Sequence, residues 1–95
     1  MRLFWSRRAI GDLGAIQAYI ENENPAAAKK VTLRIVEFVE TMIPENPAIG
    51  RPGRVPGTRE LVIAHTPYIV PYRLRYGAIE VLRVYHGARR WPDRL

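Results

Sequence analysis

The chain has 95 residues, 47 % hydrophobic content and a formal net charge of +6, which predict one small domain with a single core. It contains no cysteine, which excludes disulfide frameworks and thiolate metal sites, and its two histidines lack metal-ligand spacing, so we expect no metal and no cofactor. No apolar run is long enough for a membrane span or a signal peptide, and we therefore expect a cytoplasmic protein without a membrane partner.

The first quarter of the chain predicts a strand and a helix. Residues 2–5 form the expected strand, and Ser6 is a suitable N-cap for an apolar-periodic helix that runs to about residue 22. Gly11 and Gly14 weaken this helix, and we expect that they instead allow a neighbouring element to approach closely.

A second helix is predicted to follow at once. Asn24 before Pro25 is typical of an N-cap with proline in the first turn, and an apolar stripe continues to about residue 43. Residues 44–57 hold four prolines and three glycines, which predicts a segment without regular structure.

Three strands are predicted in the last third of the chain, over residues 58–64, 68–74 and 78–85. The turn between the last two contains Tyr76 and Gly77. A two-residue loop would force a positive φ on the bulky Tyr76, so we expect a three-residue loop with Gly77 in the left-handed conformation.

That loop determines which side chains share a face of the sheet. It places Val70 and Tyr72 with Leu82 and Val84 on a core face, although a slip of one residue would invert the third strand. The opposite face then carries Ile69, Pro71, Arg73, Arg75, Ile79, Val81, Arg83 and Tyr85. This mixture of arginine and apolar side chains is typical of protein interfaces.

The order β-α-α-β-β-β predicts a single α+β domain over residues 1–95. We expect a small, mostly antiparallel sheet with an α-helical hairpin packed on one face.

The net positive charge comes from the second half of the chain. Residues 1–48 hold six basic and six acidic side chains, whereas residues 49–95 hold nine basic and three acidic ones. This asymmetry indicates an anionic partner, either nucleic acid or an acidic protein segment, although it could simply serve solubility. Arginine outnumbers lysine thirteen to two, which favours specific bidentate pairing.

Residues 54–62, 67–73 and 81–92 together resemble toxins of the RelE/ParE superfamily from bacterial type II toxin–antitoxin modules. The resemblance covers essentially the whole chain and implies the same fold. It also implies an antitoxin partner, often with a DNA-binding segment and a C-terminal region that wraps the toxin. Operator DNA would then be contacted only through the antitoxin.

Two activities divide this superfamily. RelE-like members cleave mRNA on the ribosome with the help of basic side chains on the open sheet face, whereas ParE-like members are associated with inhibition of DNA gyrase. The positions corresponding to those basic side chains are Glu60, Val62, Ile69 and Arg89, of which only Arg89 is basic. This departure favours a ParE-like toxin that inhibits growth by binding a protein target, with DNA gyrase as the candidate.

An mRNA endonuclease that works without a metal is the alternative, and a binding module without toxicity is a third class. The nuclease would use Arg73, His86 and Arg89, or His86 with Glu60 or Glu45. A simpler expectation for His86 is a strand-end histidine bonded to backbone.

The preferred hypothesis assigns no catalytic residue. The side chains expected to contact the target are Arg73, Arg83, Arg89, Arg90 and Trp91. Those expected to contact the antitoxin are Ile69, Pro71, Arg75, Ile79, Val81 and Tyr85. The antitoxin would lay an apolar and acidic segment over the open sheet face, the helical hairpin, or both.

Overall fold

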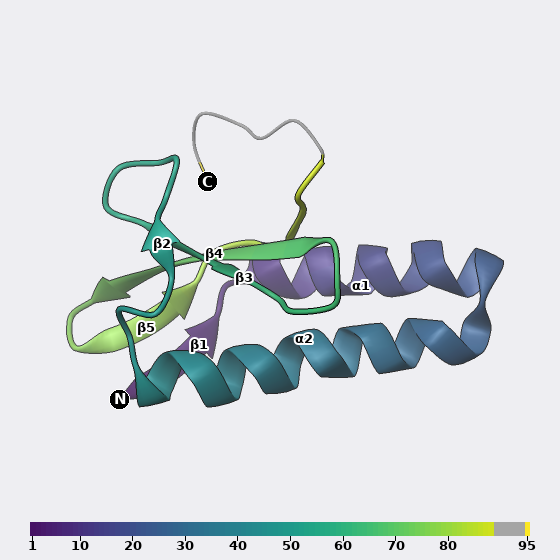
Figure 1. The fold of residues 1–95 in the computed structure, drawn as a ribbon, viewed down its shortest axis with the longest axis horizontal. Coiled ribbons are helices and arrows are strands. Elements are labelled where there is room, and N and C mark those ends of the chain that lie inside the picture. The colour runs from purple at the N-terminus through teal and green to yellow at the C-terminus, as the bar shows by residue number, and fades with distance from the viewer. Residues whose placement is uncertain (89–94) are drawn as a thin grey trace.

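The computed structural model describes residues 1–88 and residue 95, and in it two helices pack against a mixed sheet of six strands (Figure 1). The elements in chain order are β1 (Arg2–Trp5), α1 (Arg7–Glu23), α2 (Pro25–Glu45), β2 (Arg51–Pro52), β3 (Arg59–Val62), β4 (Tyr68–Arg75), β5 (Ala78–Val81) and β6 (Tyr85–His86). The predicted α+β fold is confirmed, with the two short strands β2 and β6 in addition. No helix in the described part of the chain is long and apolar enough to cross a membrane.

The sheet has the strand order β1-β5-β4-β3-β2, and β6 pairs with β4 beyond the end of β5. β1 runs parallel to β5, whereas the other neighbouring strands are antiparallel. The helical hairpin that joins β1 to the rest of the sheet covers one face and leaves the other uncovered by helices (Figure 1).

Both predicted helix caps are present. The Ser6 hydroxyl accepts a hydrogen bond from the Ala9 N–H at 3.0 Å, and the Asn24 side chain accepts one from the Ala27 N–H at 3.2 Å. These bonds satisfy backbone donors that the first turn of a helix leaves unpaired.

Two expectations for the first half of the chain are wrong. A Cβ added at Gly11 or Gly14 would meet nothing within 4 Å, so neither glycine serves a close approach. Residues 44–57 also contain regular structure, because α2 includes Pro44 in its last turn and Arg51–Pro52 forms the edge strand β2. Proline is tolerated on edge strands, where its missing N–H breaks no central ladder bond.

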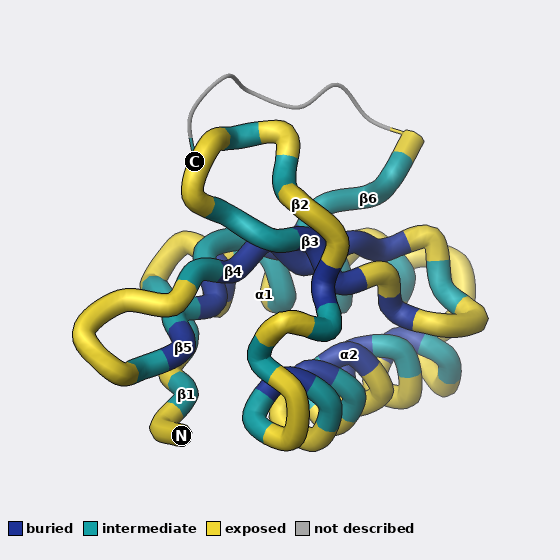
Figure 2. The backbone as a smooth tube through the Cα atoms, turned by 60° about the vertical axis from the view of Figure 1, so that its left-hand side comes forward, coloured by how far each residue is buried: buried dark blue, intermediate teal, exposed yellow. Residues whose placement is uncertain are grey.

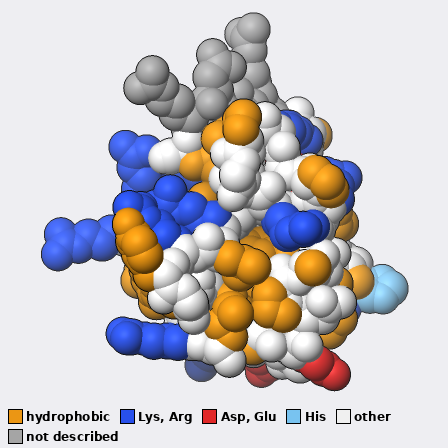
Figure 3. All heavy atoms as spheres, turned by 90° about the vertical axis from the view of Figure 1, so that its left-hand side faces the viewer, with side chains coloured by type: hydrophobic (Ala, Val, Ile, Leu, Met, Phe, Trp, Pro, Cys, Tyr) orange, Lys and Arg blue, Asp and Glu red, His pale blue; other side chains and the backbone are white. Residues whose placement is uncertain are grey.

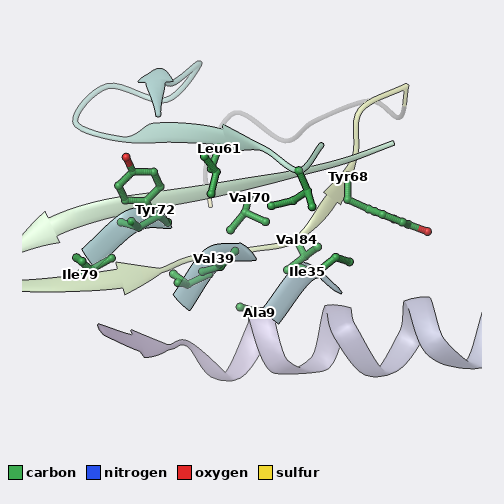
Figure 4. Close-up of a cluster of buried hydrophobic side chains, with 12 residues drawn as sticks. Ala9, Ile35, Val39, Leu61, Tyr68, Val70, Tyr72, Ile79 and Val84 are labelled. Carbon is green, nitrogen blue, oxygen red and sulfur yellow. The ribbon is translucent and has the colours of Figure 1, made fainter. Parts of the chain in front are cut away.

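The core lies between the sheet and the helices (Figure 4). Ile35 and Val39 of α2 and Ala9 of α1 are fully buried against the central strands, to which Val70 and Tyr72 of β4 contribute. Figure 2 shows the buried residues along the inner side of α2 and along the central strands.

The β4–β5 hairpin differs from its prediction by one residue. Arg75 pairs with Ala78, which leaves Tyr76 and Gly77 as a two-residue loop with φ angles of 52° and 72°. Ile79 and Val81 therefore lie on the core face and are fully buried. Burial of such a side chain contributes about 1.5–3 kcal/mol. Two of them outweigh the roughly 1–2 kcal/mol that the left-handed conformation costs one bulky residue.

Beyond β5, the strand pairing agrees again with the predicted register. Tyr85 pairs with Ile69, and Val84 is buried in the core as expected. One extra residue is accommodated within residues 82–84, where the Leu82 N–H still donates to the Pro71 carbonyl at 2.9 Å. This arrangement is a β-bulge, and it explains why the prediction fails for β5 and holds for β6.

Candidate partner-binding surfaces

Strand pairing defines the residues that face away from the helices, which we call the open face. The pairs of β1, β3, β4 and β5 place on it Arg2, Phe4, Glu60, Val62, Ile69, Pro71, Arg73, Arg75, Ala78 and Glu80. Phe4 and Val62 are exposed, so this face presents apolar side chains beside arginine and glutamate.

Glu60 anchors one side of the open face. Its side chain is only 3 % exposed, and Oε1 accepts hydrogen bonds from Arg51 Nε at 3.2 Å and Nη2 at 3.1 Å. Oε2 accepts the backbone N–H of Arg54 at 2.8 Å, and the Arg54 guanidinium lies 3.8 Å away. Both oxygens of Glu60 are therefore engaged in holding residues 51–54 to β3.

A second ion pair crosses the same face, where Arg73 Nε donates to Glu80 Oε1 at 2.6 Å. Arg2 and Arg75 differ from Arg73, because neither is in an ion pair within the described residues. The Arg75 guanidinium instead lies 5.1 Å from the centre of the Tyr76 ring. Among the described residues of the open face, these two arginines are the cations that remain available to an acidic partner.

The residues predicted to contact an antitoxin do not share one surface. Ile79 and Val81 are on the core face, so their assignment to the same face as Arg75 is wrong. Ile69 and Pro71 lie on the open face as predicted but are buried. Arg75 is exposed and Tyr85 is half-buried. Antitoxin contact by these residues stays a prediction.

A groove of about 600 Å³ lies between α1 and the last part of the sheet. It is lined by side chains that include Asp12, Ile16, Tyr19, Tyr68, Arg83, Tyr85 and His86.

Asp12 and Arg83 join the two sides of this groove. Arg83 donates to Asp12 through Nε at 2.8 Å and Nη2 at 3.0 Å, and the Val84 N–H donates to the same carboxylate at 2.9 Å. The hydrogen bonds that Arg83 donates to Asp12 raise the pKa of Arg83 above its ordinary value. The Arg83 guanidinium also lies 4.8 Å from the Tyr85 ring centre, and burial raises the pKa of Tyr85.

Asp12 was not predicted as a functional residue. The available signal is its position as the only acidic residue in the first three turns of α1, beside an apolar stripe. No sequence pattern identifies its partner, since Arg83 is 71 residues away.

His86 is held by its own strand end, as the simpler expectation has it. Its Nδ1 accepts the Ala88 N–H at 3.2 Å, and its ring packs edge-on against Tyr68 at 5.7 Å between centroids. The carboxylate that shares the groove is Asp12, whose oxygens are occupied by Arg83 and Val84. In the described part of the chain, no group of three His, Asp or Glu side chains could hold a metal ion.

The residues proposed for target contact or RNA cleavage are also separated. Arg73 is bonded to Glu80 on the open face, whereas Arg83 contacts α1 on the opposite side of the sheet, where His86 is also found. Glu60 lies on the open face and binds Arg51 and Arg54. Arg89, Arg90 and Trp91 fall outside the described residues.

A family profile described as "ParE toxin of type II toxin-antitoxin system, parDE" matches residues 3–91. The chain belongs to the ParE toxin family. A ParE toxin is one member of a two-protein module, so the family implies a cognate antitoxin as partner.

Two relatives are similar in sequence to this ParE-family toxin over nearly its whole length. "Putative toxin Y4kP" from Sinorhizobium fredii is 47 % identical over 92 residues, which is 97 % of this chain and 94 % of that protein. "Toxin RelE2" from Caulobacter vibrioides is 34 % identical over 88 residues, which is 93 % of this chain and 97 % of that protein.

Solved structures agree with this membership. A chain of the chromosomal ParDE toxin–antitoxin system from P. aeruginosa superimposes with a TM-score of 0.84 and 35 % identity, over 90 % of this chain and 95 % of that one. A chain of the intact E. coli RelBE complex has a TM-score of 0.52 at 18 % identity, over 94 % and 98 % of the two chains, and shares the fold. The predicted membership of the RelE/ParE superfamily, in its ParE-like branch, is confirmed.

Proposed function

We propose that this ParE-family toxin stops growth by binding a protein target, with DNA gyrase as the candidate, and that it performs no bond cleavage. The observation that supports this proposal concerns the open face and the groove. On both, acidic side chains of the described residues already bind arginine. Glu60 binds Arg51, and Asp12 binds Arg83 and the Val84 N–H. A general base must be able to reach the proton that it removes, and both carboxylates are already engaged in hydrogen bonds that hold elements of the fold together.

The open face is the surface proposed for the antitoxin. An antitoxin segment with acidic and apolar side chains would match Arg2 and Arg75 together with the exposed Phe4 and Val62. Of the residues expected from sequence, Arg75 would be contacted directly, whereas Tyr85 lines the groove beside α1. The others would support the surface from below: Ile69, Pro71, Ile79 and Val81. Operator DNA would be reached only through the antitoxin.

The target contact is proposed to involve the C-terminal residues Arg89, Arg90 and Trp91. Arg73 and Arg83 are left out of it, because they lie on opposite sides of the sheet and are held by Glu80 and Asp12. We predict that the double charge reversal Arg89→Glu, Arg90→Glu abolishes growth arrest, because it opposes an anionic target surface. Antitoxin affinity should largely survive, since Arg89 and Arg90 are not among the residues proposed to contact the antitoxin. Growth curves after induction and co-purification with the antitoxin measure the two effects. Full toxicity of the double variant would remove these residues from the mechanism.

RNA cleavage on the ribosome is the second candidate. Two observations favour it: the 34 % identical relative is named as a RelE toxin, and His86 lines a groove beside Arg83. Primer extension on translated messages in induced cells separates the candidates. New 5′ ends within codons would support the nuclease, whereas an SOS response with broken DNA would support gyrase poisoning.

A further inference from the structure

The tip of the β4–β5 hairpin combines an exposed aromatic ring with an unfavourable backbone conformation. Tyr76 is 91 % exposed and has a φ of 52°. Two-residue hairpin loops of this kind strongly prefer Asn-Gly or Gly-Gly, because asparagine and glycine tolerate positive φ. A tyrosine at this position makes the loop less stable and buries almost none of its own surface. The stability of the fold therefore does not account for a tyrosine ring at this position.

His65 also has a positive φ, of 64°, but its case is different. Histidine is several-fold enriched in the left-handed region. Its turn is closed by a hydrogen bond from the Thr66 N–H to the Ile63 carbonyl at 3.2 Å.

The hairpin tip projects from the sheet. Beyond Tyr72, β4 pairs with β5 and no longer with β3, and the loop lies at one end of the molecule (Figure 1). Leu74 is half-exposed beside the loop, and the Arg75 guanidinium lies 5.1 Å from the Tyr76 ring centre. Arg2 is near, because it and Arg75 both pair with Ala78. Figure 3, which views this end, shows hydrophobic side chains beside Lys and Arg side chains.

We propose that this tip, formed by Leu74, Arg75 and Tyr76, docks into an apolar cleft on an acidic surface of the toxin's folded protein target. The inference rests on the proposed function. An aromatic ring flanked by arginine is the composition of an interface hot spot. The two arginines near the tip are unpaired within the described residues, which calls for negative charge around the cleft.

The shape of the tip distinguishes a protein target from the other possible partners. Proteins that bind single-stranded nucleic acid use a cationic groove with successive stacking rings, whereas this tip is convex and presents one ring beside a leucine. An antitoxin segment laid across the open face has no cleft to receive a projecting ring. A folded protein with a preformed cleft can receive both the projecting ring and the leucine beside it.

Tyr76→Asn and Tyr76→Phe in the full-length toxin separate the ring from its backbone strain. Asparagine removes the ring and suits positive φ, so the melting temperature should stay the same or rise by a few degrees. Phenylalanine keeps the ring and the strain. We expect Tyr76→Asn to need at least about tenfold more toxin for half-maximal growth arrest, while Tyr76→Phe stays within about threefold of the wild type. Antitoxin affinity should change less than about twofold in both.

Three results would overturn this proposal while the wild type still arrests growth. In the first, Tyr76→Asn arrests growth as well as the wild type does. In the second, the variant loses antitoxin affinity tenfold, which would make the tip an antitoxin contact. In the third, the wild type binds a fluorescent oligo-dT strand and the variant does not, which would indicate nucleic acid. A wild type that causes no arrest would instead refute the proposed function, and this inference with it.

Discussion

The acidic side chains on the sheet and on the side of α1 that faces it act mainly as anchors for arginine. Glu60, Glu80 and Asp12 each bind at least one guanidinium group. Arg59 is likewise occupied, because its Nη1 donates to the Gly50 carbonyl at 2.8 Å. Much of the arginine that gives this chain its net charge therefore holds loops and elements together. The fraction available to partners is smaller than the composition suggests.

The Asp12–Arg83 pair provides a direct test at this scale. We predict that Asp12→Ala destabilises the fold by roughly 2–4 kcal/mol, because it leaves a half-buried guanidinium and the Val84 N–H without their acceptor. Glu23→Ala at the exposed end of α1 is the matched control and should change stability by less than about 0.5 kcal/mol. Urea unfolding measures both, and equal effects of the two variants would contradict this role.

Burial of Tyr72 should make the folded protein less stable at high pH. Burial raises its pKa in the folded state, although the hydrogen bond from Gly50 and the charge of Arg59 partly oppose the shift. The unfolded chain loses this proton near about pH 10. The contribution is therefore fully present below that pH and is lost as the pH rises through the folded-state pKa.

Tyr72→Phe tests this linkage. The variant should be less stable at pH 8 by about 1–3 kcal/mol, because it removes the hydroxyl that bonds Gly50 N at 2.9 Å and Pro47 O at 2.7 Å. Between pH 8 and 11 it should lose less stability than the wild type in urea unfolding. An unchanged pH slope would show that another group governs the alkaline loss.

At the scale of elements, the features that were predictable from sequence are those with local causes. The two helices follow from their caps and apolar periodicity, and Ser6 and Asn24 begin them as expected. The register of β5 was predicted wrongly, because the β-bulge that follows it depends on contacts with residues far away in the chain. Local turn preference argued against a positive φ at Tyr76, yet burial of Ile79 and Val81 in a core shared with α2 decided the register.

On the candidate surfaces, too, features with local causes could be predicted and features that depend on distant residues could not. Arginine-bearing strands were recognised from their pattern, but the distribution of the arginines over two sides of the sheet depends on partners that lie far away in the chain. Arg83 is directed to α1 by Asp12, whereas Arg73 is retained on the open face by Glu80. No spacing in the sequence distinguishes these two arginines.

Helix α1 offers a prediction of its own. Gly11→Ala and Gly14→Ala should each stabilise the toxin by about 0.5–1 kcal/mol, because both sites are exposed and an added Cβ meets nothing within 4 Å. Gly50→Ala is the contrasting variant, since its Cβ would lie 2.7 Å from a Tyr72 ring carbon, and it should destabilise. Higher urea midpoints for the first two and a lower one for the third are expected. Destabilisation by Gly11→Ala would reveal a contact absent from this structure.

For the whole molecule, the proposed antitoxin and target surfaces overlap at Arg75. This residue lies on the open face and also flanks the Tyr76 ring. An antitoxin on the open face would therefore cover part of the target-docking tip, which accounts for neutralisation by direct competition. Arg75→Glu should weaken both antitoxin binding and growth arrest by about tenfold or more, whereas Tyr76→Asn should weaken arrest alone. Loss of only one activity in Arg75→Glu would argue against a shared residue.

The central claim is that the free toxin acts by contact with its target and that the antitoxin removes this contact. A supercoiling assay with purified DNA gyrase, titrated with the toxin alone and with the toxin–antitoxin complex, tests it most directly. We predict inhibition by the free toxin, none by the complex, and intact messages when translating ribosomes are treated with the same toxin. Gyrase that stays fully active while messages are cut within codons would contradict the account.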